Sequence, residues 1–148
     1  MKKWITLLCI LTLPLFLSAC EGTTDNVEIY IGSSTMFSES EIQAAIDTVL
    51  VYFKDFEGCD LLKLWYDEDM SVMLTSDYII YGRGSVNIAE KENVIILLGD
   101  FYSGEIAEPY FAAGSTNRWK WVLIRENTTN EWIVDCSGWG PTIAVPPM

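Results

Sequence analysis

The sequence predicts an α+β fold in which one long amphipathic helix and a shorter helix pack on a mostly antiparallel sheet ending in a three-strand meander. Three observations predict it. Apolar residues recur at helical spacing between residues 39 and 56, five large apolar residues run from Val94 to Leu98, and two alternating segments near the C-terminus have hairpin spacing. Because a run of strands follows the helices, α+β is favoured over a parallel α/β sheet.

The long helix is expected from Glu39 to Phe56. Its start matches a capping box, formed either by Ser38 with Glu41 or by Ser40 with Gln43. Spacings of three and four residues then place one apolar stripe on a single helix face, made of Ile42, Ile46, Val49, Phe53 and Phe56. Gly58 is a suitable stop.

Shorter elements flank this helix. Val27–Ile31 and Leu61–Tyr66 have the apolar and aromatic content of strands. A second helix is expected from the acidic run at Asp67 to about Tyr81, because carboxylates in a first turn are favoured by the helix dipole. The five apolar residues of Val94–Leu98 predict a strand that is covered on both faces.

Arg118–Arg125 and Trp132–Cys136 form the hairpin, joined by a turn at Asn127–Asn130. A correct register must place the large apolar groups on one face. The register that does so pairs Glu126 with Glu131, Arg125 with Trp132, Leu123 with Val134 and Trp121 with Cys136.

The N-terminal segment has the organisation of a bacterial lipoprotein signal. Lys2 and Lys3 precede a short apolar stretch, and Leu17-Ser18-Ala19-Cys20 resembles a lipobox whose cysteine accepts a lipid. The alternative is a membrane-spanning anchor, but a span needs about 20 apolar residues. Ile5–Leu17 is shorter and interrupted, which is typical of a signal peptide.

These features predict four segments. Residues 1–19 are a signal peptide, residues 20–26 carry the lipid on Cys20 and form a polar linker, residues 27–137 form a single domain, and residues 138–148 form a proline-rich tail. The linker can span at most about 20 Å. We therefore expect an extracytoplasmic domain, tethered to the outer face of the cell membrane by a diacylglycerol on Cys20.

Charge excludes some classes of partner. All 21 acidic residues lie beyond Cys20, whereas Lys2 and Lys3 are two of the nine basic residues, so cleavage before Cys20 leaves a net charge of −14. Nucleic-acid binding is not expected, because it needs a basic face. The chain has no histidine, which removes the commonest general base and metal ligand.

Two cysteines remain after Cys9 leaves with the signal peptide and Cys20 takes the lipid. Cys59 and Cys136 form an even pair outside the cytoplasm, which favours a disulfide. The alternative is two separate buried thiols.

Several motifs between Ser38 and Asp135 resemble a family of uncharacterised small lipoproteins from gut Firmicutes. They are Phe-Ser-Glu at the helix start, Phe56–Cys59, Trp65–Glu68, Asn93–Leu98 and Trp119–Arg125. The resemblance implies an α+β domain similar to nuclear-transport-factor or cystatin-like folds. A leading strand at Val27–Ile31 departs from that pattern, which normally opens with helices.

The candidate site residues are few. Trp65, Asp100, Tyr102 and Trp121 could line a ligand pocket, in which Asp100 would act as a proton-transfer base if the protein were an enzyme. A larger aromatic set could instead bind a cell-surface glycan, or simply fill the core: Trp65, Tyr66, Trp119, Trp121 and Trp132. Asp67-Glu68-Asp69 could bind a hard cation, but three consecutive acids fit a helix start better.

The sequence predicts no catalytic residue, metal or cofactor. Its leading functional interpretation is a lipid-anchored domain that binds a ligand or a protein partner near the membrane surface. The alternatives are a small enzyme using a carboxylate in an apolar pocket, and a glycan binder.

Overall fold

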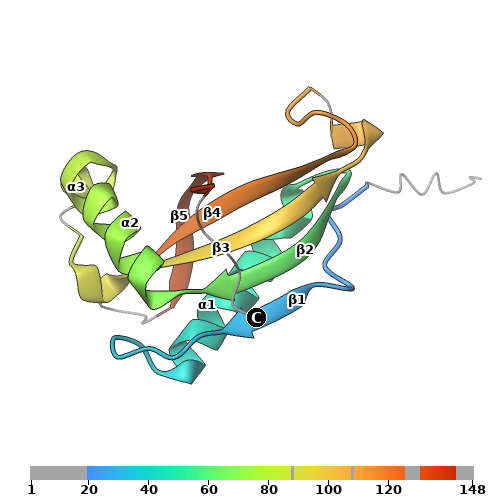
Figure 1. Ribbon diagram of the computed structural model, residues 1–148. Helices are drawn as coiled ribbons and strands as arrows, with labels where there is room; N and C mark the ends of the chain where they lie inside the picture. Colours follow the sequence, from blue (N-terminus) through green and yellow to red (C-terminus); the bar gives the residue numbers. More distant parts are fainter. Residues whose placement is uncertain (1–19, 88, 108, 126–130, 143–148) are drawn as a thin grey trace, which may run out of the picture.

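The computed structural model describes residues 20–87, 89–107, 109–125 and 131–142 (Figure 1). The expected signal peptide and the hairpin turn at residues 127–130 lie outside these residues. The elements are β1 (Glu28–Ile31), α1 (Glu39–Tyr52), the 3₁₀ turn η1 (Phe53–Asp55), β2 (Cys59–Tyr66), α2 (Glu68–Tyr81), α3 (Gly84–Asn87), η2 (Lys91–Asn93), β3 (Val94–Ser103), η3 (Glu105–Ala107), β4 (Ser115–Arg125) and β5 (Trp132–Trp139). None of the described helices is both long and apolar enough to cross a membrane.

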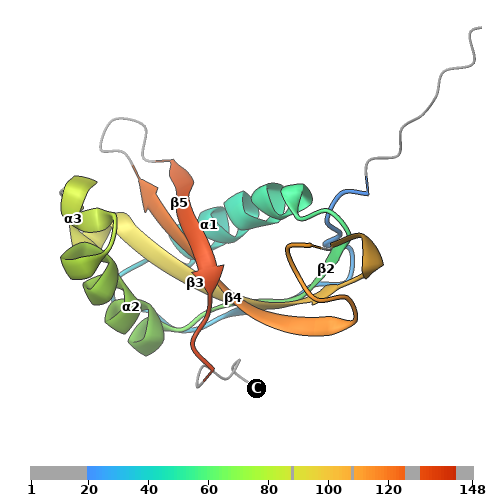
Figure 2. The same cartoon turned by 90° about the horizontal axis from the view of Figure 1, so that it is seen from above.

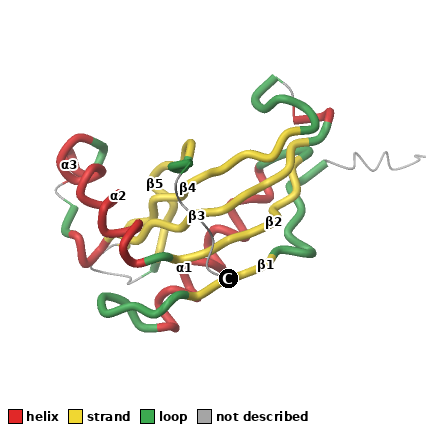
Figure 3. Tube along the Cα trace, viewed as in Figure 1, coloured by secondary structure: helices red, strands yellow, loops and turns green. Residues whose placement is uncertain are grey.

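The predicted α+β class is confirmed. The five strands lie in sequence order, with β1 parallel to β2 and the other neighbours antiparallel. α1 covers one face of the sheet, and α2 covers part of the other (Figures 2 and 3). The last three strands form the expected meander.

The larger core lies between α1 and the sheet. The predicted stripe of α1 is buried from Ile42 to Phe53, and it packs against alternate residues of all five strands. Complete burial of a large aliphatic or aromatic side chain is worth about 1.5–3 kcal/mol. This helix–sheet contact is therefore the main source of the domain's stability.

β3 is covered on both faces, as predicted. Ile95 and Leu97 face α1, whereas Val94 and Ile96 belong to the smaller core under α2. The strand is longer than its apolar run, since it continues to Ser103.

Helix boundaries follow the predicted signals closely. Ser38 and Glu41 form the capping box, and the helix tightens into η1 for its last turn. Asp67 is the N-cap of α2, and its Oδ1 accepts a hydrogen bond from the Met70 N–H at 2.8 Å. Gly82 ends that helix, but α3 was not predicted.

The hairpin register is correct at one end and wrong at the other. Arg125 pairs with Trp132 and Leu123 with Val134, as predicted. A bulge between Val122 and Leu123 then shifts the register by one residue, so Cys136 lies opposite Val122 and not opposite Trp121. A bulge reverses the face of every residue beyond it. β5 also continues to Trp139, into the segment expected to be tail.

The bulge bears on the cysteine pair. Cys59 lies in the core under α1, whereas Cys136 packs beside the core under α2, on the other side of the sheet. Both are free thiols, so the disulfide prediction is wrong and the alternative of two separate thiols holds. Burial, aided by the charge of Asp60, raises the pKa of Cys59 to about 11. Burial also raises the pKa of Cys136.

We predict that both thiols are unreactive in the folded protein and reactive after unfolding. The thiolate is the nucleophile, and a raised pKa together with burial keeps its population and accessibility low. Maleimide labelling, counted by mass spectrometry without reductant, should show two more modified thiols in the denatured protein than in the folded protein. A denatured chain that needs reductant before Cys59 and Cys136 react would contradict the free-thiol structure.

Candidate functional site

The first part of the predicted polar linker is bonded to the domain. The Gly58 N–H donates to the carbonyl oxygen of Cys20 at 3.0 Å, and the Gly22 N–H donates to the carbonyl oxygen of Lys54 at 3.0 Å. Cys20 therefore lies directly on the turn between η1 and β2.

Thr23 continues this attachment as a short parallel bridge beside β2. Its N–H donates to the Cys59 carbonyl at 2.9 Å, and its carbonyl accepts from the Leu61 N–H at 2.9 Å. The Thr23 hydroxyl donates to the carboxylate of Asp60. Two backbone bonds and one side-chain bond fix Thr23 in place.

Gly22 makes the close approach sterically feasible. It is buried, and a Cβ added there would lie 2.2 Å from the Phe53 carbonyl oxygen and 2.9 Å from that of Phe56. No other residue fits without moving the backbone. Residues 20–23 thus form an ordered edge of the domain within the segment that the sequence predicts as a polar linker.

Gly58 joins this edge to a third segment. Its φ of +70° lies in the left-handed region that favours glycine. Its carbonyl accepts from the Gly104 N–H at 2.9 Å, and a Cβ added at Gly58 would lie 3.0 Å from the Cβ of Ile106. Gly58 is therefore hydrogen-bonded both to Cys20 and to the segment after β3.

These segments form what we call the Cys20 end of the domain: Cys20–Thr23, Asp55–Gly58, Gly104–Ala107 and Pro109–Gly114. It lies at the opposite end of the sheet from α2 and α3 in both cartoon views (Figures 1 and 2). A groove of about 500 Å³ opens there. This aromatic groove is lined by Asp55, Phe56, Glu57, Ile106, Ala107, Tyr110 and Phe111.

The floor of the aromatic groove is the end of the core. The rings of Phe56 and Phe111 stack with centroids 6.1 Å apart, and Phe111 meets Phe101 and Trp119 edge-on at 4.9 and 5.5 Å. Such pairs are worth about 0.5–1.5 kcal/mol beyond their area. The floor is consequently rigid, although Ile106 is 59% exposed and Tyr110 is 85% exposed at its edge.

The rim of the aromatic groove is acidic. Asp55 and Glu57 line it, and Glu105, which precedes the lining residue Ile106 in the chain, is exposed. None of the ion pairs within the described part of the chain involves these three carboxylates. Lys54 lines the neighbouring hollow around Cys20. The groove can therefore accept an apolar group with a positive charge beside it.

The predicted pocket residues do not come together. Trp65, Asp100 and Tyr102 lie on the α2 side of the sheet, whereas Trp121 is fully buried on the α1 side. Tyr102 is 39% exposed, and Trp65 is fully buried with Leu98 under α2. Trp65 and Trp121 are core residues, so the pocket interpretation does not describe this arrangement.

Asp100 forms a bidentate ion pair with Arg118. Arg118 Nε lies 2.6 Å from Oδ1 and Nη2 lies 2.9 Å from Oδ2 of Asp100. The guanidinium also covers the ring of Trp65 at 5.2 Å. Because the arginine binds both oxygens of this carboxylate, neither oxygen is free to contact a substrate.

The acidic run at Asp67 forms the start of α2, as the helix interpretation predicted. Glu68 accepts hydrogen bonds from Thr35 Oγ1 and the Thr35 N–H, both at 2.7 Å, and from the Ser34 hydroxyl. These bonds, those to Ser34 foremost, lower the pKa of Glu68 to about 2. Within the described ranges, no three Asp, Glu or Cys side chains gather as a metal site would require.

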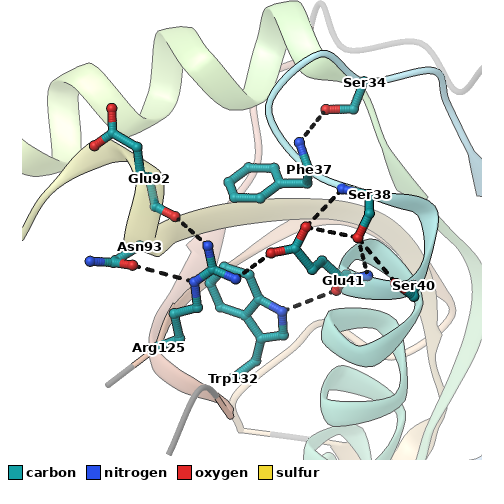
Figure 4. Close-up of polar contacts among 9 residues, drawn as sticks. All are labelled: Ser34, Phe37, Ser38, Ser40, Glu41, Glu92, Asn93, Arg125 and Trp132. Carbon is teal, nitrogen blue, oxygen red and sulfur yellow. Dashed lines mark hydrogen bonds and ion pairs between the residues drawn. The ribbon is translucent and has the colours of Figure 1, made fainter. Parts of the chain in front are cut away.

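A polar cluster that sequence reasoning missed joins α1 to the hairpin (Figure 4). Arg125 pairs with Glu41, donates to the Glu92 carbonyl at 3.0 Å, and stacks on Trp132 at 4.9 Å. Trp132 Nε1 in turn donates to the Glu41 carbonyl at 3.0 Å. The same Glu41 accepts from the Ser38 N–H at 2.8 Å, so one carboxylate serves both the capping box and the arginine.

This cluster is structural. Hydrogen bonds from Ser38, followed by the bond from Arg125, lower the pKa of Glu41 to about 2. Its partners fill both carboxylate oxygens, so it holds the start of α1 against β4 and β5.

A smaller apolar hollow of about 230 Å³ lies at the α2 end. It is lined by Met36, Phe37, Ser71, Val72, Thr75, Ser76, Ile79, Ile80, Lys91 and Val94. Its described lining contains no acidic residue, and it is remote from Cys20, so the aromatic groove is the stronger candidate for a binding site.

Comparisons with protein-family models, with curated proteins and with solved structures found no match to this chain. The candidate site therefore depends on the geometry described above. Sequence reasoning missed it because its parts are about fifty residues apart. Two kinds of signal were available in the sequence. One was the pair of glycines at positions 22 and 58, and the other was the set of aromatic residues Phe56, Tyr110 and Phe111.

We predict that Gly22→Ala detaches residues 20–23 from the domain without unfolding it. The added Cβ cannot lie 2.2 Å from the Phe53 carbonyl oxygen, so the edge must move away. Hydrogen exchange at the Gly58 amide should accelerate by at least tenfold, since its acceptor is lost. Gly138→Ala is the matched control, because a Cβ there meets nothing within 4 Å. Equal exchange at Gly58 in both variants would contradict the attachment.

We predict that Glu41→Gln removes part of the acid dependence of stability. The folded pKa of about 2 lies below the ordinary 4.5, so Glu41 stabilises the fold above pH 4.5, and this contribution is lost as the pH falls towards 2. A third of the side chain is exposed, so the contribution is about 1–2 kcal/mol. Urea denaturation should show that loss at pH 6 and much less at pH 2.5.

Glu39→Gln, in the same helical turn, is the control for this measurement and should change the free energy of unfolding little at either pH. If Glu41→Gln destabilised the protein equally at pH 6 and pH 2.5, the lowered pKa would be wrong.

Proposed function

We propose that the chain is a lipid-anchored extracytoplasmic domain, carrying a diacylglycerol on Cys20, which binds a ligand or protein partner close to the outer face of the membrane. The single observation that carries this proposal is the attachment of Cys20 to Gly58. It gives the lipobox cysteine a defined place on the folded domain, as a lipid attachment point requires if it is to orient the protein.

The attachment changes what a lipid would do. A free linker of residues 20–26 would allow about 20 Å of separation and any orientation. With Cys20 bonded to Gly58, a lipid on its sulfur would hold the Cys20 end next to the headgroups. Two acyl chains with about 0.8 kcal/mol per buried methylene give firm membrane attachment.

The other interpretations receive less support from the structure. The ion pair with Arg118 occupies Asp100, which the enzyme hypothesis needs as a free base. A glycan platform needs exposed aromatic faces, whereas four of the five aromatic residues considered for it are buried: Trp65, Tyr66, Trp121 and Trp132. We further propose that the chain belongs with the small lipoproteins of gut Firmicutes that it resembles.

Cys20→Ser tests the proposal. We predict that the native protein, expressed in a bacterium with lipoprotein processing, is recovered with membranes and carries an acylated Cys20 by mass spectrometry. The Cys20→Ser chain should carry no lipid at that position and keep its signal peptide. Cys136→Ser is the control and should stay lipidated. An intact leader or an unmodified Cys20 in the native protein would contradict the proposal.

A further inference from the structure

The aromatic groove combines three properties that do not occur together elsewhere on the described part of the chain. Its floor is aromatic, its rim is acidic, and it adjoins Cys20 through Gly58. Its volume of about 500 Å³ lies within the usual range of ligand sites. These properties restrict what can fill it.

Charge favours a cationic occupant. Asp55 and Glu57 line the groove, and neither belongs to an ion pair among the described residues. The chain beyond Cys20 has a net charge of −14. An anionic bilayer surface would be repelled by this rim at distances up to about 8 Å at physiological salt. A lysine or arginine side chain would be attracted and could also contact the face of Tyr110.

The apolar floor favours an occupant that is also hydrophobic. Phe56 and Phe111 offer ring surface to the groove, and Ile106 and Tyr110 extend it outwards. A fully hydrated cation would gain little from this surface, whereas a peptide with alternating basic and apolar faces would bury its apolar side chains on the rings. Amphipathic peptides use this mode of groove recognition.

We propose that the aromatic groove binds a basic amphipathic peptide segment, with apolar side chains on Phe56 and Phe111 and basic side chains against Asp55 and Glu57. This inference rests on the proposed function for its location, because lipidation of Cys20 places the groove at the membrane surface, where basic amphipathic peptides accumulate.

The test uses the lipidated protein in nanodiscs of zwitterionic phosphatidylcholine. The probe is a fluorescent 14-residue helix of lysine and leucine, and the comparison peptide replaces each lysine with glutamate. Empty nanodiscs measure binding to lipid alone. We expect saturable binding of the lysine peptide above that background, no binding of the glutamate peptide, and about a tenfold loss of affinity between 50 and 300 mM salt.

Paired variants locate the binding. Asp55→Asn with Glu57→Gln should weaken the lysine peptide about tenfold, and Tyr110→Ser about fivefold. The matched controls remove two carboxylates or one tyrosine ring outside the groove. Glu39→Gln with Asp77→Asn gives the same charge change, and Tyr81→Ser removes a tyrosine that is 83% exposed, against 85% for Tyr110.

Several results would overturn the inference. Equal losses in the groove and control variants would mean that net charge alone attracts the peptide. If a dye attached to the cysteine of Tyr110→Cys reported burial in lipid without peptide, the bilayer would be the occupant of the groove. If the protein dimerised with rising concentration and Tyr110→Ser abolished the dimer, the occupant would be a second copy of the chain. An unlipidated Cys20 would refute the proposed function alone, because the same peptide titration can be made with the protein free in solution.

Discussion

The arrangement of the whole Cys20 end depends on the backbone of Gly58. Its positive φ turns the chain from η1 into β2, its N–H holds the Cys20 carbonyl, and its carbonyl holds the Gly104 N–H. Three segments distant in sequence thus meet at one residue that has no side chain to separate them. A Cβ added at Gly58 would collide with Ile106 and Ala107 in the segment after β3, so only glycine fits at this position.

The two ends of the domain are stabilised by different physics. At the α2 end, the carboxylate of Glu41 connects the start of α1 to Arg125. The guanidinium of Arg125 also stacks on the ring of Trp132. The polar groups of this cluster are bonded to one another. At the Cys20 end, aromatic rings form a rigid floor, and the exposed carboxylates of Asp55 and Glu57 beside it form no ion pair with any described residue. A region whose charges are unpaired is better suited to recognition than one whose charges are already bound.

Local signals in the sequence predicted most of the elements, because capping residues and apolar spacing act over a few residues. Ser38, Asp67 and Gly82 mark helix boundaries where the structure has them. Contacts between distant segments were not predictable in the same way. The bulge beside Val122 moved Cys136 to the other face, and the bond from Gly58 made an edge of the expected linker. Neither depends on a local pattern, so the groove they help to define was missed as well.

The central claim is that Cys20 is held on the domain and is not at the end of a flexible tether. Neutron reflectometry of the lipidated protein on a supported bilayer measures the gap between headgroups and protein directly. The attachment of Cys20 to Gly58 predicts protein density that begins at the headgroups, within about 5 Å, in a single orientation. A water layer approaching the 20 Å reach of a six-residue linker would contradict it.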